Sequence, residues 1–140
     1  MAIRFFSDGI SFQPKDKRKI SQWLKSTVDR EGKIVGSLCY VFVSDEKLLE
    51  INKTFLQHDY YTDIITFDNS SGNTISGEMY ISIDTVRVNA KEYQVDFYDE
   101  LLRVIVHGVL HLCGYNDKTE KEQQQMRTAE TKYINEFAQL

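Results

Sequence analysis

The chain has few of the residues that cross-link or interrupt a protein. Its 140 residues include two cysteines, Cys39 and Cys113, and one proline, Pro14. Two cysteines are too few for the disulfide framework of a small secreted domain. One proline leaves nothing that would divide the chain into two units. We therefore expect a single domain over residues 1–140, in a reducing and cytoplasmic setting.

Long apolar runs and an excess of positive charge are lacking too. No stretch approaches the roughly 20 apolar residues of a membrane-spanning helix, and residues 1–9 lack the apolar core of a signal peptide. The formal net charge is −4, from 17 basic and 21 acidic residues. This balance argues against a non-specific nucleic-acid clamp, but it leaves room for a local basic groove. We expect no contact with a membrane.

The hydrophobic pattern predicts strands that alternate with helices, and then two strands followed by helices. Ser44, Asp84 and Asp96 are expected to cap three of the helices, and Thr119 with Glu122 forms a capping box for the last. The fold class is therefore α/β (α+β), a four-stranded mixed sheet packed with about five helices. Strands are expected at 3–6, 38–43, 63–68 and 74–83, and helices at 14–29, 45–56, 84–93, 97–113 and from 119 to near the C-terminus.

One dense motif lies near the end of the chain, where residues 107–117 read HGVLHLCGYND. His107 and His111 are four residues apart, so on a helix both imidazoles can reach one ion from the same face. Gly114 can end that helix in a left-handed cap, and the returning chain can then present Asp117 as a third ligand. Two ordinary core or surface histidines are the alternative explanation. The trailing glycine and carboxylate favour a metal site with His107, His111 and Asp117 as ligands.

Three protein ligands leave a fourth position open for water, as in catalytic rather than structural zinc sites. We therefore expect one divalent metal ion, with zinc as the first choice. Two neutral imidazoles and one carboxylate give the bound ion a lower net charge than three imidazoles would. Asp117 should consequently make the ion a slightly weaker acid toward its water, and the site less selective for zinc over harder ions.

The spacing of the motif is that of the metzincin proteases, so the motif helix is metzincin-like. Those proteases need a glutamate directly after the first histidine as general base. Here the position is Gly108, which has no side chain to take a proton. A metallopeptidase is therefore the least favoured of the possible activities.

Several motifs occur together in this chain: HGVLHLCGY at 107–115, TDIITF at 62–67 and GEMYIS at 77–82, with Ile51-Asn52, Met126 and Glu130. With these motifs the sequence resembles a known family, the bacterial YbeY proteins, over roughly residues 45–135. The resemblance implies a metal-dependent endoribonuclease for single-stranded RNA, with a role in ribosomal RNA maturation and ribosome assembly. It also implies ribosomal RNA or its precursors, and the small ribosomal subunit, as partners.

Two positions depart from the family pattern. The third ligand is usually a histidine, and this chain has Asp117 in its place. The family also has an arginine associated with RNA cleavage where this chain has Leu56, which can neither bind a phosphate nor stabilise developing negative charge. Leu56 and the acidic net charge keep an alternative open, a non-catalytic ribosome-assembly factor with a structural metal.

Four further residues are candidates for the site. Arg103 lies one turn before His107, where it can bind a phosphate or order a carboxylate behind the metal ligands, or simply form a surface ion pair. Glu78 lies on the polar face of an alternating strand and either supports the site or is solvated. Lys53 and His58 are candidates for RNA binding near the position of Leu56. The sequence predicts neither the oligomeric state nor the RNA cleavage site.

Overall fold

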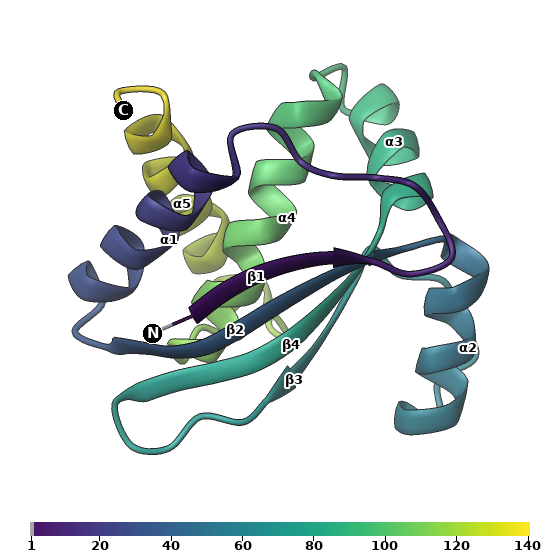
Figure 1. Ribbon diagram of the computed structural model, residues 1–140, viewed down its shortest axis with the longest axis horizontal. Helices are drawn as coiled ribbons and strands as arrows, with labels where there is room; N and C mark the ends of the chain where they lie inside the picture. Colours follow the sequence, from purple (N-terminus) through teal and green to yellow (C-terminus); the bar gives the residue numbers. More distant parts are fainter. Residues whose placement is uncertain (1) are drawn as a thin grey trace.

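The structure is a computed structural model that describes residues 2–140 (Figure 1). It confirms the expected fold class, because these residues form one four-stranded sheet with five helices packed against it. In chain order the elements are β1 (Ala2–Ser7), α1 (Lys17–Arg30), β2 (Ile34–Val43), α2 (Asp45–Leu56), β3 (Ile64–Asp68), β4 (Thr74–Ser82), α3 (Ile83–Glu92), α4 (Phe97–Leu112) and α5 (Glu120–Phe137).

The sheet has the order β1-β2-β4-β3 and is mixed. β2 runs parallel to both β1 and β4, whereas β3 is antiparallel to β4. Parallel neighbours need long connections, and helices provide them here. The antiparallel pair is instead joined by the short segment 69–73, which contains Gly72 at a positive φ of 59°. In register, Tyr40 of β2 and Thr66 of β3 lie on either side of Met79.

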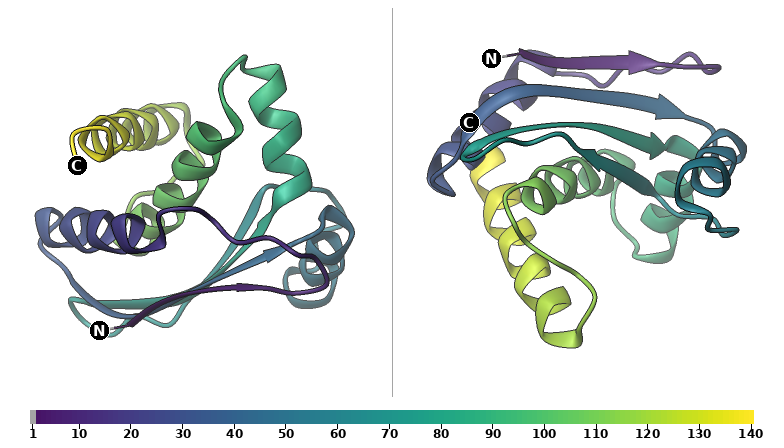
Figure 2. Two further views of the ribbon diagram at one scale, coloured as in Figure 1. Left: turned by 45° about the horizontal axis from the view of Figure 1, so that its top comes forward. Right: turned by 90° about the horizontal axis from the view of Figure 1, so that it is seen from below.

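The two faces of the sheet carry different layers. Helices α1, α4 and α5 cover one face, as the left view of Figure 2 shows. Tyr40, Met79 and Ile105 are fully buried in that layer. On the opposite face, α2 buries Leu48 and Ile51 in a smaller cluster with residues of β2 and β3.

One of the expected caps is wrong. Helix α3 begins at Ile83 and is capped by Ser82, whose Oγ accepts a hydrogen bond from the backbone N of Thr85 at 3.1 Å. Asp84, the expected cap, lies in the first turn and accepts a hydrogen bond from the backbone N of Asp45 at 3.0 Å. Strand β4 therefore ends at Ser82, one residue earlier than its alternation predicts. Ser82 is fully buried, like the apolar residues beside it, and it caps the helix that follows.

Helix α4 lies at the centre of the fold. Ten of its 16 residues are buried, and it packs against α1, α3, α5 and the sheet. Within residues 2–140, neither α4 nor any other helix combines the length and the apolar character that crossing a bilayer requires.

Candidate metal centre

Helix α4 aligns four polar side chains along one face. Glu100, Arg103, His107 and His111 follow one another at intervals of three and four residues, which is the spacing of neighbours on a helix surface. Glu100 is buried and the other three are half-buried. The remaining faces of the helix are apolar and packed into the core, so the rotation of α4 about its axis is fixed. The polar row is consequently held in one orientation.

Gly108 lets this helix approach the sheet closely. A Cβ atom at Gly108 would come within 2.9 Å of Met79 Cγ and 3.0 Å of Ile64 Cδ1, both closer than carbon atoms normally pack. This position directly follows His107, where a metzincin protease carries its catalytic glutamate. The sheet occupies the space that such a glutamate would need, which weighs further against a peptidase.

The turn after α4 brings the third candidate ligand back toward the helix. Gly114 has a φ of +111°, a conformation that side-chain-bearing residues rarely adopt. Its backbone N donates to His111 O at 3.1 Å, and the backbone N of Tyr115 donates to Leu110 O at 3.0 Å. These two bonds form a Schellman motif, the left-handed cap that the sequence predicts. The chain reverses at this point, and Asp117 returns beside His107.

Both histidines have one ring nitrogen fixed by the protein. His111 Nδ1 lies 2.7 Å from the carbonyl oxygen of Tyr115, and His107 Nδ1 lies 2.7 Å from Glu130 Oε2. Because carbonyl and carboxylate oxygens only accept, each Nδ1 is assigned as the donor. The Nε2 atoms are then left with their lone pairs for another partner. Histidines that bind metal ions in proteins are oriented in this way.

The three candidate ligands face one cavity. His107, His111 and Asp117 all line a hollow of about 260 Å³ beside β3. His107 Nε2 lies 3.4 Å from Asp117 Oδ2, and the two imidazole centroids are 5.9 Å apart. Among the described residues, no three His, Cys, Asp or Glu side chains stand close enough together to form a ready metal cage. The donor set, two Nε2 atoms and one carboxylate, nevertheless suits zinc or a similar divalent ion.

Glu130, on α5, joins Arg103 to the first histidine. Its Oε1 accepts from Arg103 Nη1 at 2.9 Å while its Oε2 faces His107, and Arg103 Nη2 also donates to Thr131 Oγ1 at 3.3 Å. Only 5% of Glu130 is exposed. Arg103 is therefore engaged with a carboxylate behind the histidine rather than free for a phosphate.

The charges around His107 favour a positive charge at the site. Burial lowers the pKa of His107, because an imidazolium loses hydration in the interior. The hydrogen bond to Glu130 and the charges of Glu130, Asp63 and Asp117 prevail over burial, so the pKa of His107 lies above 6.5. These carboxylates are thus arranged around a place where a cation is stabilised.

Two acidic residues near the site were not among the residues predicted from the sequence. Asp63 precedes β3 and lines the same cavity as the histidines. Its pKa is raised by burial, an effect that the charge of His107 opposes. The pKa of Glu100 is raised by burial and then by the charge of Asp63. The interval of seven residues between Glu100 and His107 was a usable signal, since it places both on one helix face.

Leu56 and its neighbours lie at this cavity as well. Leu56 and His58 both line it. His58 stacks on Tyr60 with ring centroids 5.2 Å apart, and its Nδ1 lies 3.0 Å from the Tyr60 hydroxyl. Lys53 instead pairs with Asp59 at 3.3 Å and is not part of the cavity wall. The structure therefore brings His58 to the candidate ligands, but not Lys53.

Glu78 lies away from the histidines. Its neighbour Met79 faces Gly108 of α4, so by strand alternation Glu78 points to the opposite side of the sheet. There it is exposed, accepts a hydrogen bond from the Tyr80 hydroxyl at 3.3 Å, and lines a separate cavity near α2. The structure gives Glu78 no contact with the candidate metal centre.

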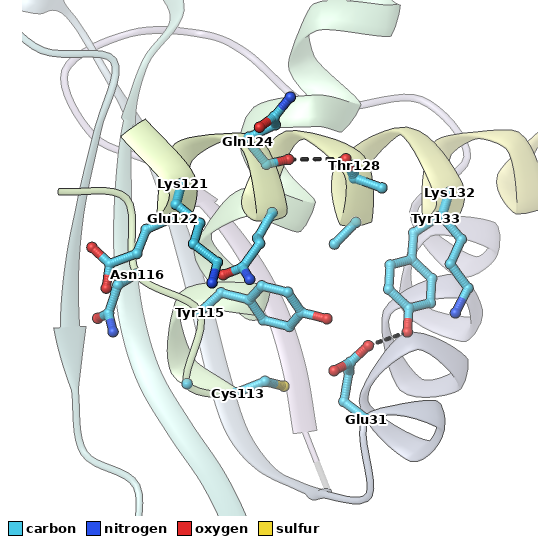
Figure 3. A pocket seen from close by; sticks show the side chains of 13 residues that line it. Glu31, Cys113, Tyr115, Asn116, Lys121, Glu122, Gln124, Thr128, Lys132 and Tyr133 are labelled. Atoms are coloured by element: carbon cyan, nitrogen blue, oxygen red, sulfur yellow. Dashed lines mark hydrogen bonds between the residues drawn. The ribbon is translucent and has the colours of Figure 1, made fainter. Parts of the chain in front are cut away.

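A larger cavity of about 810 Å³ lies on the other side of the turn at residues 113–116. Figure 3 shows its wall, in which the hydroxyl of Tyr133 donates to Glu31. None of the three candidate ligands lines it. Cys113 does, so its thiol is directed away from the histidines, and burial raises its pKa to about 12. A thiol with such a pKa stays protonated and is a poor metal ligand.

Comparison with known proteins gives consistent matches over almost the whole chain. The family model described as "Endoribonuclease YbeY" matches residues 5–138. The protein named Endoribonuclease YbeY from Parabacteroides distasonis is 48% identical over 134 residues, which cover 96% of this chain and 94% of that protein. Its namesake from Bacteroides thetaiotaomicron is also 48% identical, with 96% and 98% covered. The solution structure of TM1509 from Thermotoga maritima has a TM-score of 0.68 at 30% identity, covering 96% of this chain and 88% of that one.

Proposed function

The chain belongs to the YbeY endoribonuclease family, and on that premise we propose that it hydrolyses single-stranded RNA in the maturation of ribosomal RNA. The observation that supports this most directly is the pair of histidines with Nδ1 fixed by protein acceptors, beside Asp117 on one cavity. We take residues 1–140 to be one metal-dependent hydrolase domain. Its partners would be ribosomal RNA or its precursors and the small ribosomal subunit, in the cytoplasm.

His107, His111 and Asp117 would hold one divalent ion, with zinc as the proposed metal. When bound, such an ion polarises a phosphate oxygen or activates a water molecule. The protein fixes the two imidazoles before binding, because Tyr115 O and Glu130 hold their Nδ1 atoms. Preset ring orientation and tautomer strengthen metal binding.

Arg103 and Glu130 act in this proposal as positioning residues. Glu130 orients His107, and Arg103 holds Glu130 in place from the other side. We do not assign Arg103 to the substrate phosphate, because that carboxylate already occupies its guanidinium. Glu78, on the far face of the sheet, has no part in the proposed reaction.

The RNA strand would cross the cavity between α4 and the segment 56–60. His58 lines the cavity and offers a ring face for base stacking, which tolerates any base. Lys53, paired with Asp59 outside the cavity, would at most contact the backbone of the strand at a distance from the reaction. Leu56 supplies apolar surface to the cavity wall.

Cleavage of a ribosomal RNA precursor tests this function. The zinc-loaded protein should cut the precursor, and His111→Ala should reduce the rate by at least about 100-fold, because the ion loses one of its three protein ligands. Lys25→Ala, on the exposed face of α1, is a matched control that should keep the rate of the parent. A His111→Ala protein as active as the parent would rule the proposal out.

Leu56 favours a second candidate function, that of a ribosome-assembly factor whose metal only shapes the cleft. The two functions differ in a strain that lacks the gene. If the catalytic function holds, a His107→Ala variant that folds should fail to restore ribosome assembly. Restoration by that variant would favour the assembly role, because the altered centre cannot support hydrolysis.

A further inference from the structure

A second cavity adjoins the candidate metal centre. It has a volume of about 400 Å³ and lies between α4, α5 and the end of α3. Asp63, His107 and Asp117 line both this cavity and the one that contains His111. His107 and Asp117, two of the three candidate ligands, thus lie between the two cavities. An RNA strand with its phosphate at the metal would place a neighbouring base in the second cavity.

Glu100 is the unusual residue of this second cavity. Only 5% of it is exposed, and it lines the cavity. No hydrogen bond or ion pair to its carboxylate is found within residues 2–140, although buried carboxylates are normally paired. Burial and the charge of Asp63 raise the pKa of Glu100, and Arg103 and Arg127 only partly oppose this. The Glu100 carboxylate is therefore reached from the cavity, and no donor of residues 2–140 uses its acceptor capacity, so a ligand in the cavity can supply the donor.

The rest of the wall indicates the chemistry of that ligand. Asn89 and Gln123 line the cavity with amide groups, which both donate and accept. Tyr93 lines it too and is 54% exposed, so its ring face is available for stacking. A flat ring with N–H groups on its edge can donate hydrogen bonds to the carboxylate, exchange hydrogen bonds with the amides and stack on the aromatic ring. Nucleobases of single-stranded RNA are read through these contacts.

We propose that the Glu100 cavity is a guanine-binding subsite for the nucleotide that flanks the scissile phosphate. This inference rests on the proposed RNA substrate and names the base that it presents. Guanine is the one common base with two adjacent donors, N1–H and the N2 amino group, on its Watson–Crick edge. A carboxylate accepts both in parallel, one with each oxygen, as in other two-point contacts of charged side chains.

A second cation is a poorer occupant of this cavity. Glu130, the neighbouring carboxylate, is already paired with Arg103, and Arg127 lines the same wall. These guanidinium groups repel a metal ion electrostatically, whereas an uncharged base has no net charge for them to repel.

Binding of mononucleotides to the zinc-loaded protein tests the proposal without any cleavage. By isothermal titration calorimetry, GMP should bind at least about tenfold more tightly than IMP, which is the same nucleotide without the N2 amino group. AMP, CMP and UMP should also bind more weakly than GMP. Glu100→Gln should remove the preference for GMP over IMP, because its amide has a single acceptor oxygen. Tyr93→Ala should weaken all the nucleotides alike, by about tenfold.

Asp99→Asn is the matched control, because it removes one negative charge from the residue directly before Glu100, and Asp99 is exposed. It should bind GMP as the parent does. Equal affinity for GMP and IMP in the parent, an unchanged preference in Glu100→Gln, or displacement of GMP by Mg²⁺ alone would each overturn the guanine subsite.

These results separate the subsite from the proposed function. If GMP binds selectively but no RNA is cut, the subsite stands and the hydrolase proposal fails. If RNA is cut with the same efficiency whether or not guanine flanks the cleaved bond, and GMP is not preferred, the hydrolase stands and the subsite fails. Cleavage of oligonucleotides that differ only by guanine or inosine at the flanking position provides the comparison.

Discussion

At the scale of single residues, the candidate centre depends on side chains that would not touch the metal. Glu130 is buried and bridges Arg103 to His107. Its charge is one of the reasons why the pKa of His107 is raised, so it favours a cation at this position. Residues that orient metal-binding histidines commonly change metal affinity by one to two orders of magnitude.

Glu130→Gln should therefore weaken zinc binding about 10- to 100-fold, although the side chain keeps its length. The amide has no negative charge, and its NH₂ end cannot accept from His107. Competition with a chromophoric chelator measures the affinity. Glu120→Gln, an exposed change at the start of the same helix, should bind zinc as the parent does. Equal affinity in Glu130→Gln and the parent would contradict a positioning role.

Gly108→Ala tests the close contact between α4 and the sheet. The added methyl would meet Met79 Cγ at 2.9 Å, and overpacking of this kind costs about 1–3 kcal/mol. The better helix propensity of alanine offsets up to about 1 kcal/mol of this cost. We expect a net loss of about 1–2 kcal/mol in the free energy of unfolding, measured by urea denaturation. A more stable variant would show that Met79 has room to move.

The residues that could be predicted from the sequence are those with a spacing rule. His107, His111 and Asp117 follow one helix turn and one reverse turn, and the structure places them on one cavity. Glu78 was a candidate only through a comparison of layouts, and its face of the sheet became clear only with the packing of α4. Glu100 was missed because burial, rather than residue type, makes it unusual.

At the scale of elements, the unit that forms the centre is helix α4, its Schellman turn and helix α5. The turn after α1 has the same two backbone bonds, from Gly32 N to Asp29 O at 3.1 Å and from Lys33 N to Val28 O at 3.0 Å. Gly32 and Gly114 both have positive φ, and neither has any atom within 4 Å of a built Cβ. The turn after α3 has the same pair of bonds, with Gln94 at a φ of 57° in place of glycine. Of these three turns, only the one at Gly114 adjoins the candidate ligands.

Alanine at either glycine should reduce the free energy of unfolding by about 1–2 kcal/mol, because a positive φ is strained for a residue with a Cβ. Only Gly114→Ala should also weaken zinc binding, since its turn holds His111 Nδ1 on Tyr115 O and returns Asp117 to the site. Denaturation and zinc competition on both variants make the comparison. Similar zinc affinities in the two variants would show that the turn does not position the ligands.

Elements were predictable where a local signal is strong. The capping box of Thr119 and Glu122 is present, and so is the Ser44 cap of α2. Asp84 was expected as a cap because aspartate is a good one, but Ser82 was available two residues earlier. Asp96 is the residue before α4, yet its side chain makes no capping hydrogen bond. Which of several capable residues caps a helix depends on tertiary packing.

At the scale of the whole molecule, the strand order brings the residues of the candidate centre together, because β4 lies between β2 and β3. This order places β3, and with it Asp63, at the sheet edge nearest His107. Sequence periodicity predicted a mixed sheet of four strands but not their order, because strand order depends on contacts between distant segments. The two cavities beside His107 and Asp117 depend on that order, so they could not be predicted from the sequence.

The acidic surroundings of the centre make the stability of the whole protein depend on pH and metal together. In the metal-free protein the pKa of His107 is raised above 6.5, so the folded state holds this proton more tightly than the unfolded chain. The stabilisation is fully present below pH 6.5 and is lost as the pH rises through the raised pKa. Glu100 and Asp63, whose pKa values are also raised, act in the same direction at lower pH.

Zinc should reverse this trend. The ion needs deprotonated imidazoles, so it competes with the proton on His107, and its stabilising effect grows with pH. We expect the melting temperature of the metal-free protein to fall from pH 6.5 to pH 8, and the difference between zinc-saturated and metal-free protein to widen over the same range. Differential scanning fluorimetry at constant ionic strength measures both. His107→Gln should flatten the fall and narrow the difference, because the proton and the ion lose the same side chain. A metal-free His107→Gln protein that keeps the slope of the parent would show that other groups control the dependence.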